Sequence, residues 1–272
     1  MANNIDLRTE MVALLDEVFK EASKTSILDT DGELIKETGY AKVILILLPK
    51  ISTDEEIKYE YEPKKFEYDR YKKFTLDTID DQESGDLAFG KLASEFIRTK
   101  VVPEVDAMRI CTYAKVAEAN GSKGDVIDLS TQPGSIIIQE LNKAMDFMDE
   151  AEVPVEGRIL FTTPTVYNKI ENIPLAKSKV ILYFEQIIKV PEGRMNMDVQ
   201  LNDNGFTVNP AKKINFLVAR KDAVIQIPKH TAPKYIPFSV NNFDSDVYIY
   251  RTLQLAEVRE GKESHIYVSA MA

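Results

Sequence analysis

The longest helical pattern in the sequence lies within residues 74–119, and it constrains the fold more than any other feature. The stretch opens as a short strand, passes an acidic turn and then becomes helical. Apolar residues recur there at helical spacing, at Leu87, Leu92, Phe96, Ile97, Val101, Val105, Met108, Cys111 or Tyr113, and Val116. Pro103 interrupts the pattern, because proline lacks the backbone donor and crowds the carbonyl of Thr99. The sequence therefore predicts either one kinked helix or two helices, the second with Pro103 at its first position.

The length of this helix bears on the architecture. A continuous helix of roughly 30 residues would be about 45 Å long, which is more than a compact domain of this size needs. On the pattern alone, the stretch is a central core helix around which the rest of the chain packs.

Composition narrows the class of protein. A chain of 272 residues can form one large domain or two small ones and bury a sizeable core. The longest apolar run, residues 43–48, is too short to span a bilayer, so we expect a soluble protein made in the cytoplasm. The single cysteine, Cys111, excludes an intramolecular disulfide and lies on the apolar stripe as a small hydrophobe. A net charge of −10 argues against a protein that neutralises phosphates, and fits one that lies near nucleic acid without binding it.

The N-terminal half predicts a helix followed by an extended ribbon. Residues 1–24 place Leu7, Met11, Leu14, Val18 and Phe19 on one helical face. A nearly continuous apolar strand follows at residues 42–48 and is expected to end at Pro49. From Ile57 to Tyr71, aromatic residues alternate with charged ones, which predicts a long hairpin or ribbon with one aromatic and one charged face.

The ribbon is long for a compact domain. Twelve residues of strand span about 40 Å, whereas a compact chain of this length has a radius of gyration of about 18 Å. A two-stranded ribbon is marginal alone in water. It therefore either folds back over its own domain, as an ordinary edge hairpin, or projects onto a neighbour.

The C-terminal half predicts a mixed helix and strand layer. We expect a break at residues 120–124, a short strand at Val126 and Ile127, and a helix over residues 134–150. A buried strand should precede Thr163, which would cap a helix with Pro164 at its first position. Asn204-Gly205 indicates a tight hairpin. Four short strands follow at residues 216–219, 223–227, 247–251 and 265–268, giving an α+β layer.

The sequence offers little that resembles catalytic machinery. Its two histidines are expected to be structural or solvated, His230 in a loop and His265 inside a terminal strand. Two histidines and one cysteine do not make a conventional zinc site, and no phosphate-loop, dinucleotide or nucleophile-elbow motif is present. The acidic residues Asp77, Asp80, Asp81, Glu83 and Asp86 could hold magnesium, but more simply they place negative charge at the amino end of the long helix. We therefore expect no enzyme, no cofactor and no metal.

Three parts of the chain resemble a known family, in the same order. The first is Phe74-x-Leu76-Asp77-x-x-Asp80-Asp81-x-Glu83, then Phe96-Ile97-Arg98 and Val102-Pro103-Glu104-Val105-Asp106-Ala107-x-Arg109. The second is the strand Val153-Pro154-x-Glu156-Gly157-Arg158 with its following Thr163-Pro164 helix, and the third is the strand order after Lys221. These resemble the spine helix, axial domain and returning peripheral sheet of tailed-phage major capsid proteins with the Hong Kong 97-type fold.

The resemblance implies a division of the chain. It implies an α+β fold with an N-terminal arm at residues 1–39 and an extended β-hairpin loop at 40–76. The long spine helix and the first part of the peripheral domain then occupy 77–124, the axial domain 125–215 and the returning peripheral sheet 216–272. On this basis the N-terminal helix is expected at an interface or on the inner surface of a shell, although it could also pack on its own subunit.

The resemblance also implies a function and a set of contact residues. It implies a major capsid protein that assembles into pentamers and hexamers of an icosahedral shell around DNA, without sequence-specific DNA binding and without a membrane. A separate scaffolding protein, a portal and a decoration protein are the implied partners, and the virion is the implied location, after assembly in the host cytoplasm. The residues expected to reach other subunits are Tyr59, Tyr61, Lys64, Lys65, Phe66, Glu67, Tyr68, Asp69 and Arg70 on the loop, with Arg98, Glu104 and Arg109 on the spine.

Two alternatives stay open. An encapsulin-type nanocompartment shell shares the fold but houses cargo enzymes. A soluble α+β binding or hydrolytic protein, acting as a monomer or small oligomer, belongs to a different class.

Overall fold

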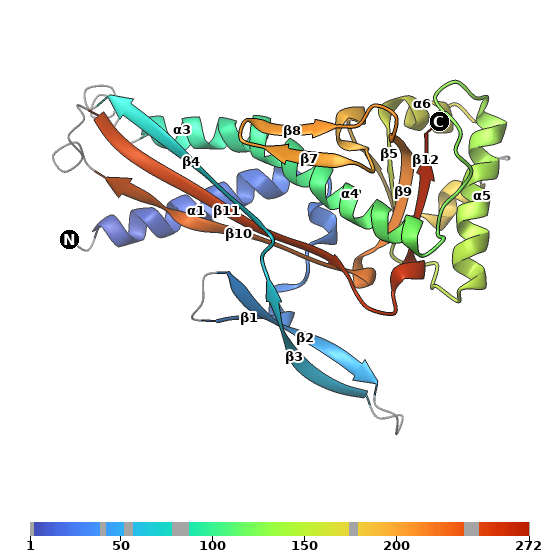
Figure 1. Ribbon diagram of the computed structural model, residues 1–272, viewed down its shortest axis with the longest axis horizontal. Coiled ribbons are helices and arrows are strands. Elements are labelled where there is room, and N and C mark those ends of the chain that lie inside the picture. Colours follow the sequence, from blue (N-terminus) through green and yellow to red (C-terminus); the bar gives the residue numbers. More distant parts are fainter. Residues whose placement is uncertain are drawn as a thin grey trace. The chain divides into compact units, whose positions relative to one another are not determined.

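The computed structural model describes residues 3–38, 42–51, 57–77, 87–173, 179–236 and 245–271. The chain forms two compact units, each assembled from separate stretches of sequence (Figure 1). The first unit comprises Met1–Ala22, Asp29–Thr99 and Gln226–Leu255, and the second comprises Ser23–Leu28, Lys100–Ile225 and Ala256–Ala272. No helix among the described residues is long and apolar enough to cross a membrane.

The first unit holds two sheets. In one, the short strand β1 (Ile35–Glu37) and the hairpin of β2 (Val43–Ile51) and β3 (Ile57–Lys65) lie in the order β1-β2-β3. In the other, β10 (Val224–Ile236), β11 (Ser245–Val258) and β4 (Tyr68–Asp77) lie in the order β10-β11-β4. The ribbon predicted over residues 57–71 is therefore two strands in two sheets, with a break at Phe66 and Glu67.

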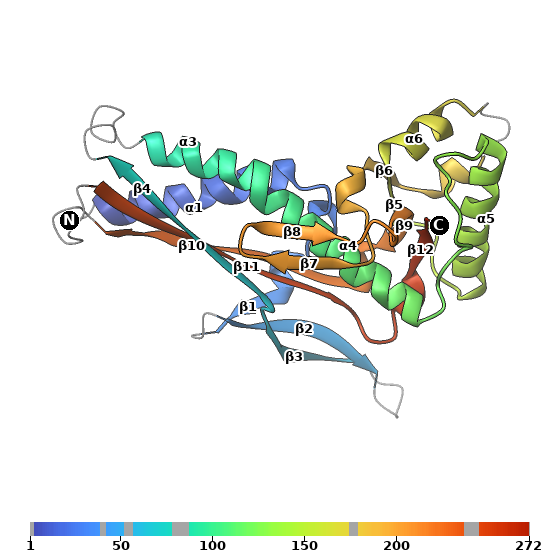
Figure 2. The same cartoon turned by 45° about the horizontal axis from the view of Figure 1, so that its top comes forward.

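Two helices pack on the β10-β11-β4 sheet. They are α1 (Asn3–Ala22) and α3 (Leu87–Phe96) (Figure 2). The ring of Phe96 in α3 contacts Phe74 of β4 and Tyr250 of β11, and Phe19 of α1 contacts His230 of β10. The predicted N-terminal helix is thus confirmed, and it packs on its own chain; its place at an interface or on the inner surface of a shell stays a prediction. Its buried face contains Leu15 together with Val18 and Phe19, whereas Leu14 is exposed.

Prolines in these sheets occur where a backbone donor is not needed. The prediction that β2 ends at Pro49 is wrong, because Pro49 lies opposite Tyr59 within the hairpin ladder. The other neighbour of β2, strand β1, pairs only with Ile44 to Ile46, so at Pro49 the outer side of β2 is a free edge. Likewise Pro228 and Pro233 lie in β10, which is at the edge of its sheet. Edge positions tolerate proline because no ladder bond is lost there.

The long helix is interrupted upstream of Pro103. Helix α3 is followed by a π-helical turn, η3 (Ile97–Val101), and then by α4 (Val102–Ala119). The wider turn accommodates the missing donor and the bulk of the proline ring before regular α geometry resumes. Of the two predicted arrangements, a single interrupted helix is closer to what is observed, with Pro103 at the second position of α4.

The second unit is built on a four-stranded sheet in the order β12-β9-β5-β6. Its strands are β5 (Arg158–Thr162), β6 (Gln186–Lys189), β9 (Ile214–Arg220) and β12 (Ile266–Ala270). Helix α4 packs on one face, and α5 (Gly134–Glu150) and α6 (Pro164–Glu171) pack on the other. A separate hairpin of β7 (Val199–Asn202) and β8 (Gly205–Val208) turns at the predicted Asn-Gly position.

Short helical turns occur between these elements in the described part of the chain. They are η1 (Ser26–Leu28), η2 (Gly32–Leu34), η5 (Lys179–Tyr183), η6 (Glu192–Arg194), η7 (Lys221–Ala223) and η8 (Glu263–His265).

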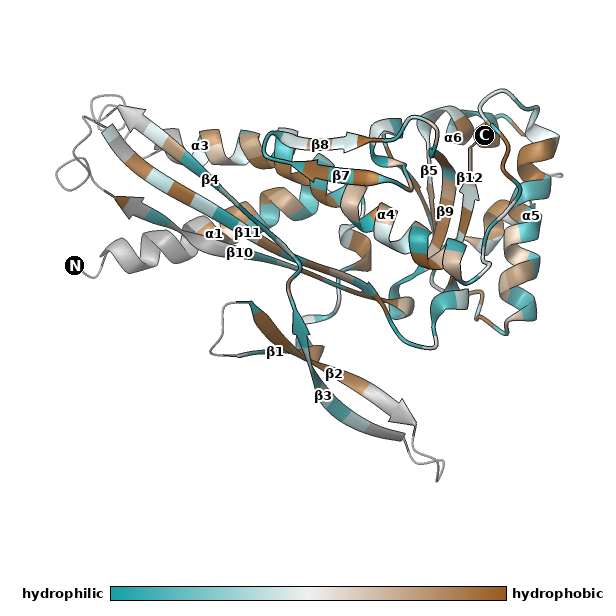
Figure 3. Ribbon diagram, in the orientation of Figure 1, coloured by the Kyte–Doolittle hydropathy of each residue, from teal (hydrophilic) through white to brown (hydrophobic). Residues whose placement is uncertain are grey.

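Alternation along the central strands explains why their sequences are almost wholly apolar. In β9, Leu217 and Ala219 join the cluster on the α4 side, whereas Phe216 and Val218 join the cluster beneath α5. In β5, Leu160 likewise belongs to the α5 side. A strand covered on both faces buries every side chain, and each fully buried apolar side chain contributes roughly 1.5–3 kcal/mol. Figure 3 shows this concentration of hydrophobic residues in β5, β9 and β12.

The prediction of a strand at Val126 and Ile127 is wrong, and the side chain of Asn215 in β9 holds this segment instead. These residues lie in a loop, and the buried Asn215 side chain holds it: Oδ1 accepts from the Leu129 N–H at 3.1 Å, and Nδ2 donates to the Ile127 carbonyl at 2.7 Å. The same Nδ2 also donates to the Ala270 carbonyl at 2.9 Å, so one amide joins the loop to β12.

We expect Asn215→Ala to destabilise the second unit by about 2–4 kcal/mol, because buried backbone groups of the loop and of β12 lose their partner. Chemical denaturation measures the change. Asn204→Ala, in the exposed β7–β8 turn, is the matched control and should shift the free energy of unfolding by under about 0.5 kcal/mol. Equal, small effects of the two variants would contradict a structural role for Asn215.

Candidate functional site

The β2–β3 hairpin presents two chemically different faces. Residues opposite one another in an antiparallel pair project to the same side of the sheet. The register pairs Leu45 with Pro63 and Leu47 with Tyr61, so these four lie on one face. This aromatic face comprises Val43, Leu45, Leu47, Tyr59, Tyr61, Pro63 and Lys65, and its opposite, the charged face, comprises Ile44, Ile46, Leu48, Glu60, Glu62 and Lys64. The predicted alternation of aromatic and charged residues is found in β3, but β2 adds apolar side chains to both faces, and Ile44 and Ile46 on the charged face are buried.

The aromatic face is exposed. Tyr59 is 65% and Tyr61 48% accessible, which is high for large side chains. The ammonium group of Lys36, from β1, lies 5.5 Å from the Tyr61 ring centroid on the same face. Exposed aromatic side chains on a projecting strand pair are the residue types that anchor protein–protein contacts.

Two predicted contact residues are covered by their own chain. Phe66 and Tyr68, at the break between β3 and β4, are 2% and 5% accessible. Their aromatic area is already used inside the first unit, so we do not include them in a proposed interface.

Asp69 was also predicted to contact another subunit. In the structure it is ion-paired within its own chain. Arg251 of β11 donates from Nε to Asp69 Oδ1 and from Nη2 to Oδ2, both at 2.7 Å. Lys42 Nζ lies 2.5 Å from the same Oδ2.

The remaining charged residues predicted on the loop are accessible to different degrees. Lys65 and Glu67 are exposed, and Lys64 and Arg70 are partly buried. Arg98 is exposed in the π-helical turn of the long helix. These five side chains stay predictions for contacts with a neighbour.

Glu104 and Arg109 of α4, which were predicted to receive the loop, lie inside the second unit. Both are buried, and Arg109 Nη1 donates to Thr25 Oγ1 at 3.1 Å. Because both side chains are buried within their own chain, we do not include them in a proposed interface.

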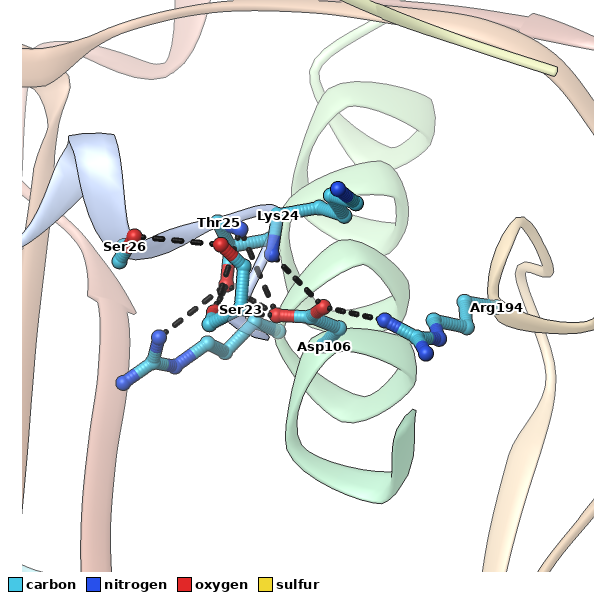
Figure 4. Close-up of polar contacts among 7 residues, drawn as sticks. Ser23, Lys24, Thr25, Ser26, Asp106 and Arg194 are labelled. Atoms are coloured by element: carbon cyan, nitrogen blue, oxygen red, sulfur yellow. Dashed lines mark hydrogen bonds and ion pairs between the residues drawn. The ribbon is translucent and has the colours of Figure 1, made fainter. Parts of the chain in front are cut away.

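Asp106 forms a buried polar cluster beside them (Figure 4). Its Oδ1 accepts from Ser23 Oγ at 2.6 Å and from Thr25 Oγ1 at 2.7 Å, and its Oδ2 accepts from the Lys24 N–H at 2.9 Å. Arg194 Nη1, from η6, completes the cluster at 2.9 Å from Oδ2. Asp106 is fully buried, so these bonds replace water around a carboxylate.

The cluster attaches the residues that follow α1 to the long helix. Ser23 to Thr25 come directly after Ala22, the last residue of α1, and each contributes a donor to Asp106. Sequence reasoning did not find this role. The signal available was an Asp106 and Arg109 pair one helical turn apart, inside a stretch of α4 that is otherwise apolar.

The residues that could support catalysis occupy structural positions. His230 lies in β10, not in a loop as predicted, and its Nδ1 is 2.5 Å from the hydroxyl of Tyr250. His265 ends η8 immediately before β12, and burial lowers its pKa. Cys111 is buried and donates to the Met197 carbonyl. Within the described ranges, no group of three or more His, Cys, Asp or Glu side chains could hold a metal ion. Asp80, Asp81, Glu83 and Asp86 of the predicted acidic cluster lie outside the described residues, and Asp77 ends β4.

The fold itself is that of capsid shell subunits. The chain has the Hong Kong 97-type α+β fold, as the resemblance predicted. The sequence matches no protein-family model and no curated protein.

Three solved structures illustrate the likeness. The chain is similar to the capsid of the cyanophage P-SCSP1u, with 14% identity and a TM-score of 0.52 over 90% of this chain and 86% of that one. It is similar to the mature capsid of bacteriophage PhiM1, with 14% identity and a TM-score of 0.53 over 86% and 83%. It is also similar to the virus-like particle from Pyrococcus furiosus, with 12% identity and a TM-score of 0.54 over 96% and 98%. At these identities the likeness defines the fold.

Proposed function

We propose that this chain is the major capsid protein of a tailed bacteriophage or prophage, which assembles into pentamers and hexamers of an icosahedral shell around DNA. The observation that carries the proposal is the extent of the fold likeness, which spans at least 86% of this chain in each of the three comparisons. A shell of this kind is held by repeated contacts between copies, and obligate interfaces commonly bury upwards of roughly 2,000 Å².

The hairpin is the proposed contact element. Its aromatic face offers Tyr59 and Tyr61 to a neighbouring copy, and Lys64, Lys65, Glu67, Arg70 and Arg98 offer charges around it. The apolar side chains would supply buried area, and the charges would favour one orientation over others.

We propose that segments 1–39, 40–76, 77–124, 125–215 and 216–272 have the assembly roles of arm, extended loop, spine, axial domain and returning peripheral sheet. These are roles in a shell and not separately folding pieces. Strands β5 and β6 from the fourth segment share one sheet with β9 and β12, and β4 from the second pairs with β11 from the fifth. Scaffolding, portal and decoration proteins are the partners proposed for such a subunit, the virion is its proposed location, and assembly is proposed to occur in the host cytoplasm.

The acidic net charge of −10 supports a shell that encloses DNA without binding it tightly. Salt-dependent capture of duplex DNA by the purified subunit would count against this part of the proposal.

A nanocompartment shell is the second candidate. It is favoured by the virus-like particle from Pyrococcus furiosus, which this chain matches over 96% of its own length and 98% of that chain. The two candidates differ in content: a phage capsid protects DNA from nuclease, whereas a nanocompartment encloses protein cargo.

Light scattering after size exclusion, with negative-stain microscopy, tests the proposal. We expect closed particles of megadalton mass, formed by the chain alone or after co-expression with the product of the adjacent gene. A chain that stays monomeric in both conditions overturns the shell assignment and favours the soluble binding or hydrolytic class. Nuclease-protected DNA in native particles then separates the two shell candidates.

Charge reversal at Lys64 and Lys65 should impair shell formation without unfolding the subunit. Both flank the root of the hairpin, and at least Lys65 is exposed, so Lys64→Glu with Lys65→Glu opposes any acidic surface on the neighbour. We expect closed-particle yield to fall at least about fivefold, because a factor of that size needs only about 1 kcal/mol per contact. Particle yield by light scattering and secondary structure by circular dichroism are the two measurements.

Lys72→Glu with Lys73→Glu is the matched control for that variant. These exposed residues lie on β4, outside the hairpin, and change the net charge by the same amount. Normal particle yield from the Lys64 and Lys65 variant, or an equal loss from both double variants, would remove these two lysines from the interface.

A further inference from the structure

The chain changes sheet at the root of the hairpin. Strand β3 ends at Lys65 and β4 begins at Tyr68, so only Phe66 and Glu67 connect the β1-β2-β3 sheet to the β10-β11-β4 sheet. Such a short irregular connection can rotate about its backbone dihedrals unless neighbouring contacts hold it. The direction of the hairpin therefore depends on what fixes these residues, together with the packing of Ile44 and Ile46 of β2, which are buried.

The backbone on the other side of the hairpin provides one contact. The Phe66 N–H donates to the Lys42 carbonyl at 3.0 Å, immediately before β2 begins. The Phe66 side chain is also buried. The two ends of the hairpin are thus joined to each other, but this bond alone does not tie them to the second sheet.

Asp69 provides the tie to the second sheet. Asp69 is the second residue of β4; its carboxylate accepts two parallel bonds from Arg251 of β11 and is paired with Lys42 at the hairpin root. The two bonds from one guanidinium fix the plane of the carboxylate as well as its position. Asp69 is therefore in contact with both sheets and with the start of the hairpin.

The charge state of this cluster is stable. Hydrogen bonding from Arg251, with further help from Lys42, lowers the pKa of Asp69 to about 2. The folded pKa is below the ordinary value, so the interaction is fully present above about pH 4 and weakens only as the pH falls toward 2. At neutral pH the Asp69 carboxylate is therefore charged and paired.

Gln226 of β10 bonds to Asp29 and Thr30, a few residues before β1. A second ion pair, between the sheets themselves, is more exposed than the Asp69 cluster. Lys229 of β10 lies 3.0 Å from Glu37 of β1, but the Glu37 side chain is 73% accessible. An exposed pair of this kind contributes little, because water and salt screen it. The Asp69 side chain is only 21% accessible and has two cationic partners, so it is the stronger of the two ties.

We infer that Asp69 is a positioning residue, which fixes the direction in which the β2–β3 hairpin leaves the β10-β11-β4 sheet of its own subunit. It acts within the chain instead of pairing with a neighbouring subunit. The purpose of this fixed direction rests on the proposed function. A hairpin held at one angle binds a neighbouring subunit at lower entropic cost than a freely rotating one.

Hydrogen exchange of the full chain tests the inference directly. Asp69→Asn keeps the shape of the side chain and removes its charge. We expect amides of peptides covering residues 42–51 and 57–77 to exchange roughly tenfold faster in this variant, since charge-assisted bonds are about twice as strong as neutral ones. Glu37→Gln is the matched control at the exposed pair and should change the same rates by less than about twofold. Unchanged exchange in Asp69→Asn overturns the inference.

Particle formation by the same variants separates this inference from the proposed function. Faster exchange together with fewer or misshapen particles supports both. Unchanged exchange with failed assembly returns Asp69 to an inter-subunit role and overturns the inference alone. A wild-type chain that forms no closed particles overturns the proposed function, while faster exchange in Asp69→Asn still supports Asp69 as the positioning residue.

Discussion

Replacing Asp106 with alanine is expected to destabilise the second unit by about 3–5 kcal/mol, the cost typical of removing one partner from a buried ion pair. The carboxylate is fully buried, and five donors from two chain segments converge on it: Ser23 Oγ, the Lys24 and Thr25 N–H groups, Thr25 Oγ1 and Arg194 Nη1. In the alanine variant Arg194 loses its anion and the residues after α1 lose their attachment to α4. The free energy of unfolding from chemical denaturation measures the total loss.

The pattern of the loss distinguishes this explanation from general damage to α4. Hydrogen exchange should rise first in residues 23–28, which the carboxylate holds, and only later in the central strands β5 and β9. Asp106→Asn keeps the shape and part of the hydrogen bonding, so it should cost less, about 1–3 kcal/mol. Asp146→Ala, at an exposed position of α5, is the control and should stay within about 0.5 kcal/mol of wild type. A loss under about 1 kcal/mol in Asp106→Ala would mean that the cluster does not stabilise the fold.

Sequence reasoning succeeded where the structure is decided locally. The spacing of Ile137, Leu141, Met145 and Met148 defines one helical face, and α5 has the predicted bounds. The apolar runs 159–161 in β5 and 216–219 in β9 predict buried strands, because a strand buried on both faces has no polar side. The resemblance added the fold, which the likeness to solved shell subunits confirms.

Pairing between distant segments was not predictable from local pattern. Tyr68, the first residue of β4, pairs with Gln254 of β11. The local sequence around either residue does not indicate this pairing. A strand with alternating aromatic and charged residues looks the same whether it continues a hairpin or joins another sheet. For this reason the sequence predicts one ribbon that continues through Phe66 and Glu67, with Asp69 in an extended loop, whereas the structure divides it between two sheets.

The same limit applies to buried charge. The resemblance implied that Glu104 and Arg109 of the spine reach other subunits, and charged residues in a helix are ordinarily expected at its surface. Both are buried, as is Asp106. The partners of Asp106 and Arg109 come from the segment after α1 and from η6, more than 80 residues away in sequence. Only the fold brings these groups together, and burial then requires that each be paired.

The second large effect is expected on assembly and not on folding. Replacing Tyr59 and Tyr61 together with threonine should reduce the yield of closed particles at least about tenfold, because aromatic anchors at an interface commonly contribute 2 kcal/mol or more each. Threonine keeps the β propensity of the strand, and both tyrosines are exposed in the isolated chain, so the fold should be retained. The loss recurs at every subunit of a shell, which makes the total effect on particle yield steep.

Tyr71→Thr provides the control for this experiment. Tyr71 is the most exposed of the three tyrosines, at 75%, but it lies on β4 outside the hairpin. If the aromatic face of the hairpin carries the contact, light scattering should show normal particles for Tyr71→Thr and mostly unassembled subunits for the double variant, with matching circular dichroism spectra. Normal particles from the Tyr59 and Tyr61 variant would exclude this face as the anchor. A loss of particles from Tyr71→Thr alone would move the anchor to the open face of the β10-β11-β4 sheet, where Tyr71 lies opposite Arg251.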